Sequence, residues 1–391
     1  MNVTTTERLP IKVWQLSEED GPDDQVMAQL RNLANLPIAE KWVCAMPDFH
    51  VGYGMPIGGV LATRGGIIPY AVGVDIGCGM IAAQTSLDAD IFTFEEYQEL
   101  RLAIHERVPV GHVHHKADQP MPRRLHTLRP DIESSVVGSQ YKRASRQIGT
   151  MGGGNHFLEL QRDTEGRLWI MLHSGSRNVG KQVCDHYHKV ARRYMRDFAS
   201  AVPDPDLSFL PESVPEYASY LAEMEWCMAF AEESRNVMLD RALEALVIAV
   251  GHPVNVDMLV DTHHNFAAME HHYGQNYLVH RKGAVRATGY VTIPGSMQTA
   301  SYICKGLEPE ESFNTCSHGG GRTMGRNVAN RMMEDRHDEA VGMMAHVAFN
   351  VRAGDYDELG HCYKDIDAVV AAQADLVEPY MRLTPLAVVK G

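Results

Sequence analysis

Four glycine-rich segments that carry histidine, cysteine or aspartate are spread along this 391-residue chain. They lie at residues 46–80, 149–177, 262–283 and 314–322. Glycine lets the backbone come close to a ligand, and carboxylate, thiolate and imidazole groups are side chains that hold divalent cations. If these segments form one site, a division into two independent domains would cut through it. We therefore expect a single large domain over residues 1–391.

The last of these segments contains a histidine followed by three glycines and an arginine, from His318 to Arg322. The bare backbone of the glycines would let a phosphate approach, and the guanidinium would bind its oxygens. A histidine that accepts a phosphoryl or nucleotidyl group needs these surroundings. A glycine loop in which the histidine makes only a local hydrogen bond fits this segment equally well.

The other three segments contain candidate metal ligands. Taken singly each is weak, because an isolated cysteine is more often a small buried apolar residue and an isolated histidine near a strand end is more often structural. Asp75 and Cys78 differ, since a three-residue separation on a glycine-rich turn can aim both side chains at one point, where the thiolate could bridge two ions. By softness alone, a thiolate site favours zinc or another late metal over manganese. The candidates are Asp75, Cys78, His156, His173 and His264.

Taken together, the motifs resemble the RtcB-type RNA-splicing ligase family over nearly the whole length, from residue 46 to residue 391. Such ligases join an RNA 3′-phosphate or 2′,3′-cyclic phosphate end to a 5′-hydroxyl end, using GTP and manganese. The resemblance implies an α+β fold, a large mixed α/β catalytic domain with a central metal-binding cleft. The matching stretches, in the family's order, are residues 52–59, 73–79, 154–159, 173–177, 264–265, 280–283, 293–297 and 317–322.

The resemblance also implies a role for each candidate residue. His318 becomes the residue that is guanylylated, and Cys78 becomes the ligand shared by two manganese ions. We choose His264 over its neighbour His263 as a ligand because Asn265 follows it, as in the family. The other ligands implied are Asp75 and His156 on one ion and His173 with His264 on the second.

A GTP-binding pocket follows from the same resemblance. Glu159 and the penultimate residue, Lys390, would contact the edge of the guanine. Phe157 and Tyr363 would cover its two faces. The remaining contacts implied are Ser301 with the guanine, and Asn155, Asn265, Gly320, Gly321 and Arg322 with the phosphates.

Two positions depart from the family pattern. Gly320 stands where alanine is usual, and Gln298 stands where glycine is commoner. A glycine in place of alanine bears on the stiffness of the loop. Both changes leave the ligand set intact, so they bear on rate or substrate preference more than on the reaction.

The composition indicates the compartment. Seven cysteines, an odd number at irregular spacing, argue against a disulfide framework. The polar N-terminus does not resemble a signal peptide, and no apolar run approaches the roughly 18 residues of a membrane span. We expect a cytoplasmic protein with no membrane partner.

The formal net charge of −14 fits an RNA-binding enzyme poorly, because binding to phosphates usually calls for a basic surface. Local basic clusters soften this objection, although exposed helix faces often carry such charges without a partner. We favour the cluster at 142–146 as an RNA contact because it directly precedes the 149–159 motif. The clusters are Arg123, Arg124 and Arg129; Lys142, Arg143 and Arg146; and Lys189, Arg192, Arg193 and Arg196.

The hydrophobic pattern predicts both strands and helices. Residues 168–172 and 277–279 have the apolar character of buried strands and would deliver His173 and His280 at their ends. Residues 180–200 and 215–250 are predicted helices. We expect the aromatic and methionine residues of the second helix to belong to the core, namely Tyr217, Tyr220, Met224, Trp226 and Phe230.

Three other functions remain open on the sequence. The ligand types also suit a dinuclear metal-dependent phosphoesterase in which His318 only binds phosphate. A guanylyl-capping enzyme for 3′-phosphate ends, without ligation, would use the same residues. A non-catalytic RNA-binding metalloprotein is the third alternative. The target RNA, the acceptance of DNA ends, the need for an archease-type helper and the oligomeric state are also left open.

Overall fold

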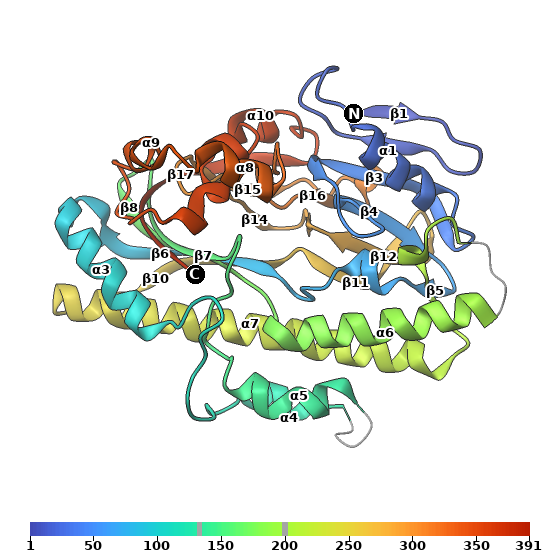
Figure 1. Ribbon diagram of the computed structural model, residues 1–391, viewed down its shortest axis with the longest axis horizontal. Coiled ribbons are helices and arrows are strands. Elements are labelled where there is room, and N and C mark those ends of the chain that lie inside the picture. Colours follow the sequence, from blue (N-terminus) through green and yellow to red (C-terminus); the bar gives the residue numbers. More distant parts are fainter. Residues whose placement is uncertain (131–134, 198–201) are drawn as a thin grey trace.

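The computed structural model describes residues 1–130, 135–197 and 202–391, which combine helices and sheets (Figure 1). The helices are α1 (Asp24–Ala34), α2 (Pro69–Val72), α3 (Phe94–Arg107), α4 (Arg123–Thr127), α5 (Val136–Ser145), α6 (Arg177–Asp197), α7 (Pro215–Val250), α8 (Arg326–Met333), α9 (His337–Met343) and α10 (Ile366–Ala371). The strands are β1 (Asn2–Thr4), β2 (Ile11–Val13), β3 (Ala39–His50), β4 (Ile57–Thr63), β5 (Gly66–Ile67), β6 (Gly79–Asp88), β7 (Phe157–Asp163), β8 (Arg167–Ser174), β9 (Leu210–Pro211), β10 (Val256–His263), β11 (Asn265–His272), β12 (Gln275–Lys282), β13 (Ala284–Arg286), β14 (Tyr290–Ile293), β15 (Ser301–Gly306), β16 (Thr315–Ser317) and β17 (Val377–Lys390).

The larger sheet has the strand order β10-β6-β8-β7-β17-β15-β14 and is antiparallel throughout. Its two edge strands approach each other, so that the hydroxyl oxygens of Thr262 and Thr292 lie 3.4 Å apart. The sheet therefore curls almost into a barrel, which leaves little free strand edge. The C-terminal strand β17 lies in the middle of this sheet, between β7 and β15.

The second large sheet has the order β1-β2-β3-β4-β12-β11, in which only β2 and β3 run parallel. Strand β16 pairs with β13, which follows β12 after Gly283. This pairing carries the segment after β16, which begins with His318, to the end of β12. The hydrophobic core here includes Trp14, Val60 and Val279, all fully buried.

Helices α6 and α7 run side by side along one side of the molecule (Figure 1). Helix α7 has 36 residues, with Pro215 at its start and Gly251 in the left-handed conformation at its end, as helix-terminus chemistry favours. The prediction of two helices is confirmed, although the predicted end at residue 200 lies outside the described residues. The predicted core residues of α7, Trp226 and Phe230 among them, are buried.

The predicted α+β class is confirmed by these mixed layers. The strand predictions are also confirmed, since β8 covers 168–172 and β12 covers 277–279. Across the described parts of the chain, no helix is both long and apolar enough to span a membrane.

Candidate metal and nucleotide site

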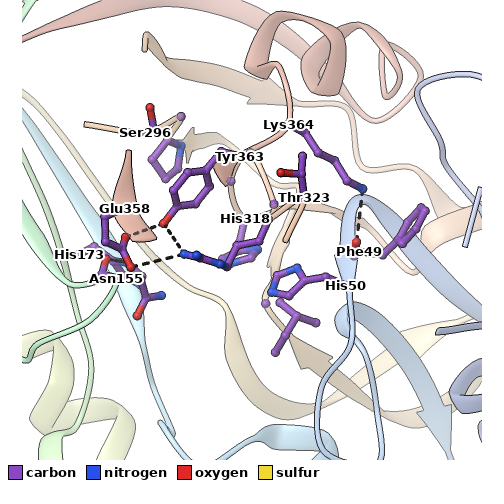
Figure 2. Close-up of a pocket in the computed structure, with 18 of the residues that line it drawn as sticks. Phe49, His50, Asn155, His173, Ser296, His318, Thr323, Glu358, Tyr363 and Lys364 are labelled. Carbon is purple, nitrogen blue, oxygen red and sulfur yellow. Dashed lines mark hydrogen bonds and ion pairs between the residues drawn. The ribbon is translucent and has the colours of Figure 1, made fainter. Parts of the chain in front are cut away.

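A cavity of about 930 Å³ is lined by strands of both large sheets and by the loop after β16. Figure 2 shows its wall, where His173, His318 and Tyr363 are contributed by segments far apart in the sequence. The predicted central cleft is thus present. All of the residues expected from the sequence line it except His156, which lies directly behind.

The first group of candidate ligands consists of Cys78, His173 and His264, all buried. The Cys78 Sγ atom is 3.1 Å from His173 Nε2, which is 3.2 Å from His264 Nε2. The other ring nitrogen of His173 lies 3.0 Å from the carbonyl oxygen of Asn155. Because a carbonyl only accepts, Nδ1 of His173 carries the hydrogen and Nε2 keeps its lone pair for an ion.

The second group consists of Asp75, Cys78 and His156. His156 Nε2 is 3.0 Å from Asp75 Oδ2 and 3.4 Å from Cys78 Sγ. Cys78 is therefore common to both groups, which is the arrangement of a bridging thiolate. The turn that makes this possible passes through Gly77, whose φ is +70° and whose added Cβ would lie 2.7 Å from the Cα of Met228.

The strand ends explain why these ligands meet. Cys78 directly precedes β6, and β6 pairs with β8 so that Met80 lies opposite His173. His264 stands between β10 and β11, and its backbone N–H donates to the Cys78 carbonyl at 2.9 Å. Its neighbour His263 points elsewhere, with Nδ1 3.0 Å from the Gly77 carbonyl oxygen.

The electrostatics of these groups fit a cation. Burial, with the charge of Asp75, raises the pKa of the Cys78 thiol well above its usual value. Burial lowers the pKa values of His173 and His264 well below the usual range, so both rings are neutral. Among the described residues, Nδ1 of His264 and Nδ1 of His156 have no hydrogen-bond partner although both are buried. A divalent cation would turn the thiol into a thiolate and would take the lone pairs of the clustered Nε2 atoms, which leaves each Nδ1 as the N–H side of its ring.

His318 is fixed by an aspartate that the sequence analysis did not assign to the site. Asp48, fully buried, places Oδ2 2.5 Å from His318 Nδ1 and accepts from the backbone N–H groups of His318 and Gly319 at 3.1 and 3.2 Å. The ring is thereby oriented with Nε2 as its remaining reactive atom. The rings of His318 and His264 have their centroids 4.8 Å apart. The signal in the sequence was present, because Asp48 belongs to the first glycine-rich segment.

Glu358 is a second residue missed from the sequence. It accepts from the Tyr363 hydroxyl at 2.5 Å (Figure 2). It pairs with Lys390 Nζ at 3.3 Å. It also pairs with Arg322 at 3.5 Å and with Arg326. Burial opposes its ionisation, but the charges of Lys390 and Arg326 lower its pKa to about 2. Gly354, Asp355, Gly360, His361 and Cys362 lie around it, the same mixture of glycine and ligand-type residues as in the four segments, so a signal for this region was present in the sequence but was not used.

The remaining expected residues fall on two sides of the cavity. Strand pairing sets Lys390 opposite Phe157 and Val388 opposite Glu159, which brings the C-terminus to the cavity wall. Asn265 uses its side chain within the loops, donating to the Asp75 carbonyl at 3.0 Å and accepting from Gly283 N at 2.8 Å.

The two departures from the family pattern are accommodated. A Cβ on Gly320 would meet nothing closer than 3.5 Å. Gln298 donates to the Met343 carbonyl at 2.8 Å and accepts from the backbone N–H of Gly360. It therefore links the 296–299 turn to the segment that leads to Tyr363.

Comparison with known proteins identifies the family of this chain. A family model described as tRNA-splicing ligase RtcB matches residues 29–129 and 126–391. The RNA-splicing ligase RtcB of Escherichia coli K12 is 37% identical, over 99% of this chain and 98% of its own. The Mycobacterium tuberculosis protein of that name is 31% identical, covering 93% of this chain and all of its own. The tRNA-splicing ligase RtcB of Pyrobaculum aerophilum is 30% identical, over 100% of this chain and 96% of its own. This chain belongs to the RtcB family.

Proposed function

We propose that this protein is a GTP- and manganese-dependent RNA ligase that joins 3′-phosphate or 2′,3′-cyclic phosphate ends to 5′-hydroxyl ends. The observation that carries the proposal is the shared Cys78 between two ligand groups, with His318 held beside them by Asp48. The relatives named as RNA-splicing and tRNA-splicing ligases support the reaction class. One catalytic domain over residues 1–391 and a cytoplasmic location are part of the same proposal.

The metal assignment follows the two groups. Asp75 and His156 would hold one manganese ion, His173 and His264 a second, and Cys78 both. The ions would neutralise charge on the phosphate oxygens and activate a hydroxide that opens a cyclic phosphate end. The thiolate alone would favour a softer metal, so manganese rests on the family.

The first chemical step would use His318 as a nucleophile. Its Nε2 lone pair attacks the α-phosphorus of GTP, a P–N bond forms, and the bond to pyrophosphate breaks. Asp48 holds the proton on Nδ1 throughout and stabilises the positive charge that develops on the ring. Arg322 lies at the cavity wall beside Tyr363, where its guanidinium would contact the phosphates.

Two transfers complete the reaction. An oxygen of the RNA 3′-phosphate attacks the phosphorus of the histidine-bound GMP, which frees His318 and leaves RNA-(3′)pp(5′)G. The 5′-hydroxyl of the second strand then attacks the RNA phosphate, and GMP leaves. In this scheme Phe157, Tyr363, Glu159, Ser301 and Lys390 bind the guanine.

The basic surface on α5 is our candidate for the RNA contact. Lys142 and Arg143 are exposed there, whereas Arg146 is paired with Asp118 at 2.6 Å. The loop that begins at Gly111 runs along the end of α5, and Arg177 donates to the Gly111 carbonyl at 2.6 Å. Gly111 packs against Gly391, which follows Lys390 of the cavity wall, so this loop connects the end of α5 with the nucleotide side.

A test of the function begins with α-labelled GTP and manganese. We expect an acid-labile, base-stable covalent label that His318→Ala abolishes while metal content stays near wild type. His114→Ala, which changes an exposed histidine outside the cavity, is the matched control. Absence of label from the wild type would favour a phosphoesterase or a non-catalytic binding protein.

The second stage supplies RNA with 3′-phosphate and 5′-hydroxyl ends. Transfer of GMP without sealing would identify a capping enzyme instead of a ligase. Reversing the charges of Lys142 and Arg143 should weaken RNA transfer and flatten its salt dependence, but spare GTP labelling. The same reversal at Lys189 and Arg192 on α6 is the control. Repeating the assay with an archease-type helper, and with DNA 3′-phosphate ends in place of RNA, tests whether a helper is needed and whether DNA is accepted.

A further inference from the structure

Strand β7 carries a stripe of polar side chains into the interior of the barrel-like sheet. Along one face it presents Glu159, Gln161 and Asp163, each buried. Glu159 lines the cavity, while Gln161 is one position deeper and does not reach it. Asp163, at the far end, accepts from Trp169 Nε1 at 2.8 Å and from Gln84 Nε2 at 3.1 Å.

The amide of Gln161 contacts two of the residues expected to read the base. Its Nε2 donates to Glu159 Oε2 at 2.6 Å and to Ser301 Oγ at 3.3 Å. Ser301 Oγ also accepts from the backbone N–H of Gly295 at 3.3 Å. A hydroxyl has two acceptor positions and one donor hydrogen, so the Ser301 hydrogen is left to donate.

The other end of the same amide has no partner. Gln161 is fully buried, and within the described chain no donor lies within hydrogen-bond distance of its Oε1. A buried acceptor without a partner costs stability, and an apolar side chain of similar volume would avoid that cost. The hydrogen bonds of Nε2 are therefore the one advantage that glutamine has here over an apolar side chain.

We propose that Gln161 is a positioning residue that sets the base specificity of the nucleotide pocket, by holding Glu159 as an acceptor and Ser301 as a donor. This inference rests on the proposed function, in which Glu159 and Ser301 bind the guanine of GTP. Guanine has N–H donors at N1 and its 2-amino group, which match the carboxylate, and acceptors at O6 and N7 for a hydroxyl. Adenine has an acceptor at N1, so the carboxylate would be left unmatched.

The ionisation of Glu159 depends on this amide. Burial raises its pKa to about 8, and the hydrogen bond from Gln161 and the charge of Lys390 both oppose that rise. Losing the amide would favour the protonated carboxyl, which is a poorer acceptor for the guanine donors.

The experiment compares GTP, ITP and ATP as labelling substrates at a series of concentrations. ITP lacks the 2-amino group but keeps O6 and N7. For Gln161→Leu and for the more flexible Gln161→Met we expect the preference for GTP over ITP to narrow about tenfold, the loss of one charge-assisted hydrogen bond. Metal content should stay at the wild-type level. In a Glu159→Gln background, the same substitution should narrow the preference no further.

Gln84→Leu is the matched control, because that amide also donates to a buried carboxylate but at the other end of the barrel. It should leave the nucleotide preference unchanged. A Gln161→Met protein that folds, labels and keeps the full preference for GTP over ITP would overturn the proposal. If the wild type forms no label, the proposed ligase fails, and equilibrium binding of GTP and ITP to the same variants decides the role of Gln161 separately.

Discussion

Asp48→Asn should slow guanylylation without emptying the metal sites. In the native arrangement one oxygen of Asp48 accepts from the His318 ring and from two backbone N–H groups. An asparagine oxygen can still serve the backbone groups, but it carries no charge. If its amide group faces the ring instead, His318 Nδ1 must accept, and the proton moves to Nε2, the atom that has to attack phosphorus.

The expected fall in rate follows from the hydrogen bond between Asp48 and the His318 ring, the interaction that changes most. A hydrogen bond to a charged group contributes about 1.5–3 kcal/mol, and each 1.36 kcal/mol is about tenfold in rate. Because Asp48 is fully buried, solvent does not replace the lost charge. We therefore expect the single-turnover rate of covalent labelling to fall by about 10- to 150-fold.

The assay is rapid-quench labelling with α-labelled GTP, with metal content measured on the same preparation. Asp163→Asn is the control, since Asp163 is also a buried aspartate with several donors but lies at the far end of the barrel. It should lower stability and leave the labelling rate of the folded fraction unchanged. A labelling rate within threefold of wild type for Asp48→Asn would refute the assigned role of Asp48.

Three further results are expected. Cys78→Ala should lower metal content at both sites, and full occupancy in the variant would contradict a bridging role. Because burial raises the thiol pKa, metal uptake by the wild type must release a proton, so metal affinity should rise with pH. Lys390→Ala should raise the GTP concentration for half-maximal labelling by about one to two decades and narrow the preference over ATP, with metal content as the control. Gly320→Ala should be neutral or stabilise the fold by about 0.4–1 kcal/mol in urea unfolding, because a Cβ there meets nothing closer than 3.5 Å.

The sequence predicted the helices, the strands and the types of metal ligand better than it predicted which distant side chains contact one another. Residue patterns were enough for α7 and for β8, because α7 is long and rich in strong helix formers and β8 has a continuous apolar run. The grouping of Asp75 with Cys78 follows from local spacing. The distant histidines could be assigned only by resemblance, since strand pairing such as that of β6 with β8 is not encoded in any short segment.

Contacts made across long distances in sequence were missed for the same reason. Asp48 and His318 are separated by 270 residues, and Glu358 and Lys390 meet only because two unrelated segments border one cavity. Gln161 carries no motif at all, and its contact with Ser301 depends on the strand order β7-β17-β15. Residues that hold other residues in place are recognisable only when the partner is known.

The C-terminal strand β17 lies in the sheet that carries both the base-binding residues and the metal ligands. Ordinary chain ends fray, but β17 is a central strand whose neighbours are β7 and β15. Strand β7 carries Glu159 and β15 begins with Ser301, so the base side of the cavity is bounded by strands that β17 joins. The metal ligands, by contrast, are complete once His264 has been folded against β6. Because β17 pairs with β7, which directly follows His156, the strand supports the metal side of the sheet as well as the base side. Loss of the Lys390 side chain alone removes a base contact and no metal ligand, so this substitution separates nucleotide selection from metal binding.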